Sequence, residues 1–198
     1  MTVMTSAIHD ALLIIDVQND FLPGGALGVP NGDHVIAPIN RLSGLPFRCV
    51  IASQDWHPPE HISFDAMGGP WPSHCVRGTP GAELAQTLDQ TRIRHIVRKG
   101  TSPAHDSYSA FCDDGGMTTG LAALLGGLDV RRIFIAGLAL DFCVAATALD
   151  ARRAGFEAIV VMDACRPVHR IWEATQTSLQ KAGVEILHTS SLTDVTMP

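Results

Sequence analysis

Short apolar runs alternate with amphipathic stretches along most of the chain. The first run, residues 11–16, is continuously apolar and ends on the carboxylate of Asp16, which is typical of a parallel strand covered on both faces. We expect further strands at residues 47–53, 93–99, 133–137, 158–162 and 184–187. The spacing of apolar residues predicts helices at 33–43, 82–88, 121–125, 141–154 and 172–182.

Strands that alternate with helices predict a three-layer α/β/α fold with a mostly parallel sheet of about six strands. We expect one domain that spans residues 1–198. Residues 54–81 and 101–120 interrupt the alternation, and loops of this length in a compact domain are usually functional.

Composition narrows the classes of function. Hydrophobic residues make up 46% of the chain and charged residues 17%, a balance typical of folded proteins. The net charge of −6 argues against nucleic acid or an anionic membrane as partner, and no run approaches the roughly 20 apolar residues of a membrane span. Five scattered cysteines and no visible export signal predict reduced thiols and a cytoplasmic location. We expect a small-molecule substrate, and a homodimer is compatible with the sequence.

Polar side chains follow successive predicted strands. Asp16 ends the first strand, Asp55 and His57 follow the second, Lys99 ends the third and Cys143 follows the fourth. Ligands of parallel sheets bind outside the carboxyl ends of the strands. We therefore expect these side chains to form one site.

Cys143 is the candidate nucleophile. We expect it in the first turn of the helix at 141–154, which Asp141 would cap, and there the helix dipole favours a thiolate. Lys99 would lower the pKa of this thiol further, and Asp16 could receive and return a proton. The alternative is that Cys143 is only a small buried apolar residue, and its position alone does not decide between the two interpretations.

A second cluster combines one carboxylate with imidazoles. Asp55, His57 and His61 lie close together in the sequence, and His74 follows in the same loop. Oxygen and nitrogen ligands without thiolate suit one divalent ion, for which we expect Zn²⁺, with Mn²⁺ or Fe²⁺ as alternatives. At the position of His61 the ion could instead take Ser63, Glu60 or water.

At these motifs the sequence resembles the nicotinamidases (pyrazinamidases) of the isochorismatase-like cysteine hydrolases. The matching segments are 16–21, 55–57 with His61, 71–75, 99–100, 106–111 and 137–144. The chain departs from the resemblance at Leu140 and Phe142, where that family often has threonine and tyrosine.

The resemblance implies a catalytic triad of Asp16, Lys99 and Cys143. It also implies a cis peptide bond between Leu138 and Ala139, with the backbone N–H groups of Ala139 and Cys143 as an oxyanion hole.

The implied reaction is hydrolysis of nicotinamide to nicotinate and ammonia in NAD salvage, through a thioester on Cys143, with pyrazinamide as a further substrate. The metal would orient the pyridine ring, Phe21 and Trp71 would form aromatic walls, and Tyr108 is a further candidate for this wall.

Three alternatives remain at this stage. In a metal-hydroxide amidase Cys143 would be structural. A metal-free isochorismatase-type enzyme or carbamoyl amidohydrolase would need no ion. A catalytically silent binding or scaffold protein is the third, and the intact set of Asp16, Lys99 and Cys143 argues against it.

Overall fold

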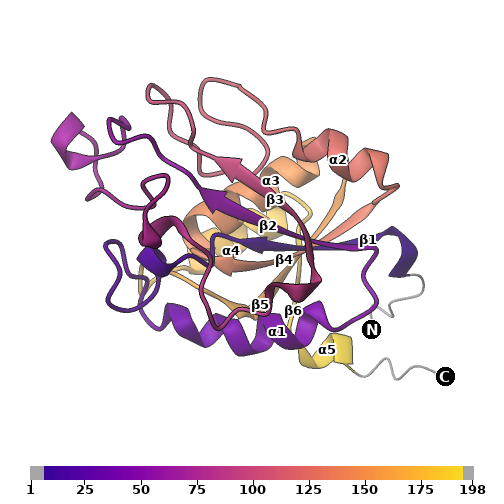
Figure 1. Cartoon of the computed structure of the whole chain (residues 1–198). Helices are drawn as coiled ribbons and strands as arrows, with labels where there is room; N and C mark the ends of the chain where they lie inside the picture. The colour runs from indigo at the N-terminus through magenta and orange to yellow at the C-terminus, as the bar shows by residue number, and fades with distance from the viewer. Residues whose placement is uncertain (1–6, 194–198) are drawn as a thin grey trace.

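A six-stranded sheet forms the middle layer of the computed structural model, which describes residues 7–193 (Figure 1). The strand order is β3-β2-β1-β4-β5-β6, and every neighbouring pair is parallel. The strands are β1 Asp10–Ile15, β2 Cys49–Asp55, β3 Ile93–Lys99, β4 Arg132–Leu138, β5 Glu157–Arg166 and β6 Glu185–Leu187. The predicted fold class is confirmed.

Helices cover both faces of the sheet because its central strands are apolar on both faces. In β1, Leu12 and Ile14 pack on one side, and Leu13 and Ile15 pack on the other. The side of Leu12 is covered by α1 and α5, and the side of Leu13 by α2, α3 and α4. The helices are α1 Ile36–Ser43, α2 Leu121–Gly127, α3 Ala145–Arg153, α4 Glu173–Lys181 and α5 Ser190–Thr193.

The predicted helix at 82–88 is wrong. Leu84 instead forms an antiparallel bridge with Gln18, and the backbone N–H of Ala85 donates to the carbonyl of Val17 at 2.9 Å. The apolar positions Leu84, Ala85 and Leu88 are buried as expected, but against the chain that leaves β1. Backbone pairing with a distant segment therefore decides the local structure here.

The predicted helix at 141–154 is correct in place but not in its first turn. Residues Leu140–Val144 form a π-helical turn, and α3 begins only at Ala145. The side chain of Asp141 does not cap this turn.

The strand order reverses between β1 and β4, and a ligand crevice is expected there. The two strands approach closely at Gly137, where a Cβ atom would lie 2.1 Å from the carbonyl oxygen of Ile15. The φ angle of Gly137 is 127°, which side chains rarely allow. Glycine is therefore required beside the crevice.

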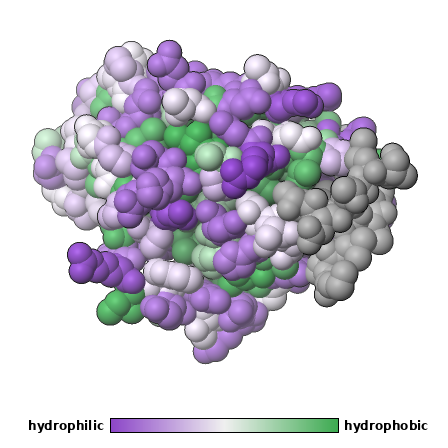
Figure 2. Space-filling model, turned by 90° about the horizontal axis from the view of Figure 1, so that it is seen from below, coloured by the Kyte–Doolittle hydropathy of each residue, from purple (hydrophilic) through white to green (hydrophobic). Residues whose placement is uncertain are grey.

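The face seen in Figure 2 is mixed in character. Hydrophilic residues predominate, and apolar residues lie between them in several groups. Within residues 7–193, no helix combines the length and apolar character that a membrane span requires. The homodimer stays a prediction.

Candidate active site

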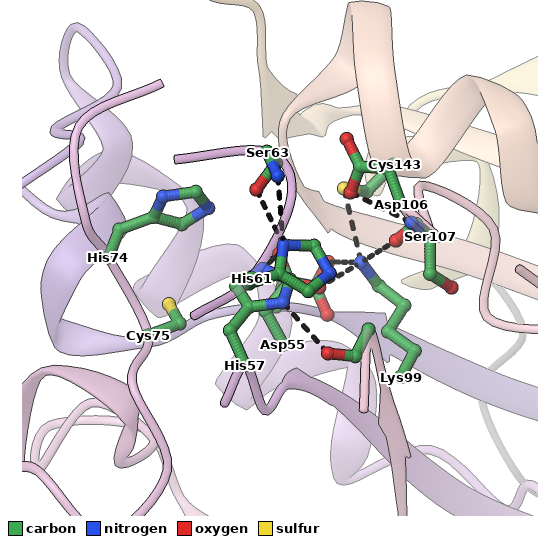
Figure 3. A network of polar contacts seen from close by, with 12 residues as sticks. Asp55, His57, His61, Ser63, His74, Cys75, Lys99, Asp106, Ser107 and Cys143 are labelled. Carbon is green, nitrogen blue, oxygen red and sulfur yellow. Dashed lines mark hydrogen bonds and ion pairs between the residues drawn. The ribbon is translucent and has the colours of Figure 1, made fainter. Parts of the chain in front are cut away.

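Lys99, the last residue of β3, lies at the centre of a buried polar network (Figure 3). Its Nζ lies 2.9 Å from Oδ2 of Asp16, 2.5 Å from Oδ1 of Asp55 and 3.4 Å from Sγ of Cys143. It also donates to the carbonyl of Ser107 at 2.8 Å. Burial favours the neutral amine, but Asp16 and Asp55 outweigh it and raise the pKa of Lys99 well above its ordinary value. Lys99 is therefore an ammonium ion.

Asp16 follows β1 in a left-handed conformation with a φ angle of 50°. Ser53, from the neighbouring strand β2, donates its hydroxyl to Oδ1 of Asp16 at 2.6 Å. Burial raises the pKa of Asp16, and the opposing charge of Lys99 does not fully offset that effect. A carboxylate with a raised pKa is a better proton acceptor than an ordinary aspartate.

Cys143 lies in the π-helical turn after β4, with 6% of its surface exposed. Carboxylate oxygens of Asp16 and Asp55 lie within 4.8 Å of its sulfur and of each other. Burial raises the pKa of Cys143 well above its ordinary value, although Lys99 opposes the shift. The predicted lowering of this pKa is therefore contradicted, because desolvation outweighs the favourable charge. The thiol needs a base, and Asp16 is close enough to be one.

The cis peptide bond between Leu138 and Ala139 is confirmed. Ala139 and Cys143 both line one pocket at the carboxyl end of β4. The carbonyl of Ala139 accepts hydrogen bonds from the N–H groups of Phe142 and Val144, so the turn is tied to this peptide.

Asp55, His57 and His74 form the candidate metal site. One ligand atom from each lies within 4.8 Å of the others, and all three residues are buried. Nδ1 of His57 bonds to the carbonyl of Gly100 at 2.9 Å, and Nδ1 of His74 to that of Pro72 at 2.7 Å. Such bonds fix the tautomer of a metal-binding histidine and leave Nε2 for the ion. The three side chains therefore fit a divalent metal ion.

His61 lies outside this group of three. Its Nδ1 contacts the hydroxyl of Ser63 at 2.7 Å, and its Nε2 lies 3.2 Å from the carbonyl of His105. The His61 ring packs against His57 with a centroid distance of 3.9 Å. Burial, followed by the charge of His57, lowers the pKa of His61 to about 4. In this arrangement His61 supports the ring of His57.

The carboxylates of Asp16 and Asp55 also gather around Cys143, as a metal site could. The Lys99 ammonium contacts all three of these side chains, and its positive charge disfavours a cation among them. The histidine group is therefore the better candidate.

The three predicted aromatic residues, Phe21, Trp71 and Tyr108, all line the pocket beside Cys143. Nε1 of Trp71 donates to the hydroxyl of Tyr108 at 3.1 Å, and Phe142 packs against both rings. The structure thus places the aromatic residues, the metal candidates and the sulfur around one opening.

Three residues support the site although their sequence positions do not indicate such a role. Ser53 binds Asp16, and Gly100 accepts the hydrogen bond that orients His57. The amide of Gln18 bonds to both the N–H and the carbonyl of Asp55 at 2.8 Å. Gln18 stands in a matched motif, but its role depends on the pairing of β1 with β2.

A buried cysteine, lysine and carboxylate at the reversal of a parallel sheet fit a hydrolase with a three-layer α/β/α fold. A comparison with protein families agrees, because residues 10–191 match the family described as the isochorismatase domain. The chain belongs to the isochorismatase family.

Several individual relatives belong to one subgroup of this family, the nicotinamidases and pyrazinamidases. The chain is 43% identical to the nicotinamidase of Acinetobacter baylyi over 93% of its own length and 91% of the relative's. The solved structure of PnC1 from L. infantum in complex with nicotinate has 47% identity and a TM-score of 0.94, covering 96% of this chain and 98% of that one. The pyrazinamidase of Pyrococcus horikoshii in complex with zinc has 40% identity and a TM-score of 0.80, with coverage of 91% and 99%.

Proposed function

We propose that this chain is a nicotinamidase, which hydrolyses nicotinamide to nicotinate and ammonia. The observation that carries the proposal is the contact of one ammonium, that of Lys99, with the sulfur of Cys143 and the carboxylates of Asp16 and Asp55. The relatives named as nicotinamidases, and the neighbour in complex with nicotinate, support the same substrate.

The first half of the reaction forms a thioester. The thiol of Cys143 passes its proton to Asp16 while the sulfur attacks the carboxamide carbon of the substrate. Negative charge develops on the carboxamide oxygen, which the N–H groups of Ala139 and Cys143 would stabilise. Asp16 then gives its proton to the departing nitrogen, which leaves as ammonia.

The second half releases the product. Asp16 takes a proton from a water molecule, whose oxygen attacks the thioester carbon. The bond between carbon and sulfur breaks, and the sulfur recovers a proton from Asp16. The product leaves as nicotinate after its new carboxyl group releases the second proton of the water to the solvent. Lys99 keeps its charge throughout and holds Asp16 beside Cys143.

Asp55, His57 and His74 would hold the divalent ion, and zinc is the ion that we propose. The buried oxygen and nitrogen donors, and the zinc complex of the P. horikoshii relative, support that choice. When bound, the ion supplies a Lewis-acidic position for the pyridine nitrogen. His61 remains a predicted further ligand.

Phe21, Trp71 and Tyr108 would enclose the flat ring of the substrate. Pyrazinamide keeps the carboxamide and a nitrogen at the same place in the ring, so the same pocket would accept it. All five cysteines are free thiols, which supports the proposed cytoplasmic role in NAD salvage.

The test is release of ammonia from nicotinamide by the zinc-loaded wild type and by Cys143→Ala. We expect wild-type turnover, and we expect the variant to lose turnover while it still binds zinc and nicotinamide. Cys112→Ala is the matched control, because Cys112 is a free thiol outside the pocket. If Cys143→Ala kept most of the activity while chelation removed it, a metal-hydroxide amidase would be the better assignment.

A further inference from the structure

Asp141 is a buried carboxylate next to the active-site pocket that has no role in the proposed chemistry. Only 5% of its side chain is exposed. Its Oδ1 accepts the N–H of Val168 at 2.9 Å, and its Oδ2 accepts the N–H of His169 at 2.8 Å. Nδ1 of His169 lies 2.8 Å from the same Oδ2. The carboxylate therefore binds a different segment of the chain rather than its own helical turn.

That segment, residues 167–172, is the loop between β5 and α4. Within the part of the chain that the structure describes, every hydrogen bond recorded between residues 167–171 and other segments ends on Asp141. Ile171 in this loop is 82% exposed, so it contributes little packing. Asp141 is the polar anchor of the loop.

The loop and the turn that Asp141 joins both form walls of the pocket. Val168 from the loop and Phe142 from the π-helical turn line it together with Cys143. The ring of Phe142 also lies 5.5 Å from that of His169 and 5.3 Å from that of Trp71, measured between centroids. Moving the loop would therefore move Val168 directly and Phe142 through its contact with His169.

We propose that Asp141 is a positioning residue, which sets the distance between the Val168 and Phe142 walls and so determines how tightly the pocket holds a flat pyridine carboxamide. The inference rests on the proposed function, because it names the ring that the walls hold. Asp16, Lys99 and Cys143 lie at the ends of β1, β3 and β4 rather than β5, and Lys99 contacts both Asp16 and Cys143, so the loop can shift without separating them.

The decisive experiment measures KM and kcat for nicotinamide hydrolysis by Asp141→Asn. An amide keeps one acceptor oxygen but presents an N–H₂ group to the backbone donors of the loop, so at least one charge-assisted hydrogen bond is lost. We expect KM to rise about tenfold, while kcat stays within about threefold of the wild type.

Asp163→Asn is the matched control. Asp163 is also an aspartate that anchors a backbone segment, since it accepts the N–H of Thr189 at 2.8 Å and the hydroxyl of the same residue, but it does not line the pocket. We expect this variant to lose stability without a change in KM. Equal KM values for the two variants would overturn the inference.

A second variant keeps the test decisive if Asp141→Asn does not fold. His169→Ala retains both backbone hydrogen bonds to Asp141 and loses only the imidazole, so we expect KM to rise about threefold. An unchanged KM, or a fall in kcat without a change in KM, would overturn the inference. If the wild type released no ammonia from nicotinamide, the proposed function itself would fail. If the wild type were active and the variants kept its KM, only the role of Asp141 would fail.

Discussion

Gly100 offers the sharpest test of the candidate metal site, because its carbonyl orients His57. The residue has a φ angle of 62°, and a Cβ atom there would lie 2.3 Å from Cε1 and 2.5 Å from Nδ1 of His57. The His57 ring has little room to move away, since it packs against His61 and Phe64. Gly100→Ala should therefore displace the ring and break its bond to the carbonyl of residue 100.

The expected magnitude has two parts. A left-handed alanine costs about 1–2 kcal/mol of stability wherever it occurs. Loss of the partner that orients a metal-binding histidine costs roughly 10–100-fold in metal affinity, which equals about 1.4–2.7 kcal/mol. Gly155→Ala isolates the first part, because Gly155 has a φ angle of 89° and nothing within 4 Å of an added Cβ.

The assay is competition for zinc between each variant and a coloured chelator, with urea unfolding as the measure of stability. We expect Gly100→Ala to lose more stability than Gly155→Ala, because only its added Cβ clashes with His57, and we expect only Gly100→Ala to lose zinc affinity. If Gly100→Ala held zinc as tightly as Gly155→Ala, the assignment of His57 as a metal ligand oriented by Gly100 would be refuted.

Three further predictions follow from the same network. Asp16 must be ionised to accept a proton, so activity falls as the pH drops through its raised pKa. The hydroxyl of Ser53 donates to Asp16 and lowers this pKa, so Ser53→Ala should raise it. The acid limb of the profile of kcat/KM against pH should then move to higher pH. An unmoved limb would mean that Asp16 is not the base. Lys99→Met leaves two buried carboxylates without their cation and should cost about 3–5 kcal/mol in the free energy of unfolding, measured in urea. The control is Lys181→Met, which changes an exposed lysine. A smaller loss for Lys99→Met than for Lys181→Met would contradict the central role of Lys99. Chelation should abolish ammonia release and added zinc should restore it, whereas full activity without metal would favour the metal-free alternative.

The strands and the candidate catalytic residues at their ends could be predicted from the sequence. Continuous apolar runs identify buried parallel strands, and a parallel sheet brings the ends of those runs to one edge. Asp16, Lys99 and Cys143 therefore meet as expected. Asp55, His57 and His74 also meet, although His74 comes from further along a loop that the pattern does not resolve.

Other features of the fold and the site could not be predicted, because they depend on contacts between segments that are distant in the sequence. The apolar residues near Leu84 suit a helix as well as an extended segment, and pairing with Gln18 decides between them. The thiol state of Cys143 depends on the depth of its burial, which the position in a helical turn does not indicate. The role of Asp141 depends on a loop that begins after β5, and no local signal connects the two.

Nζ of Lys99 lies closer to the carboxylate of Asp55, at 2.5 Å, than to that of Asp16, at 2.9 Å, so Asp55 serves two purposes. It offers an oxygen to the candidate ion, and it is a second carboxylate beside the lysine that contacts the proposed nucleophile and the proposed base. Asp16 already balances the charge of Lys99, so a descendant of this enzyme that lost the imidazoles at positions 57 and 74, and with them the ion, would bury an uncompensated negative charge at position 55. Divergence toward metal-independent chemistry should thus change the aspartate together with the histidines.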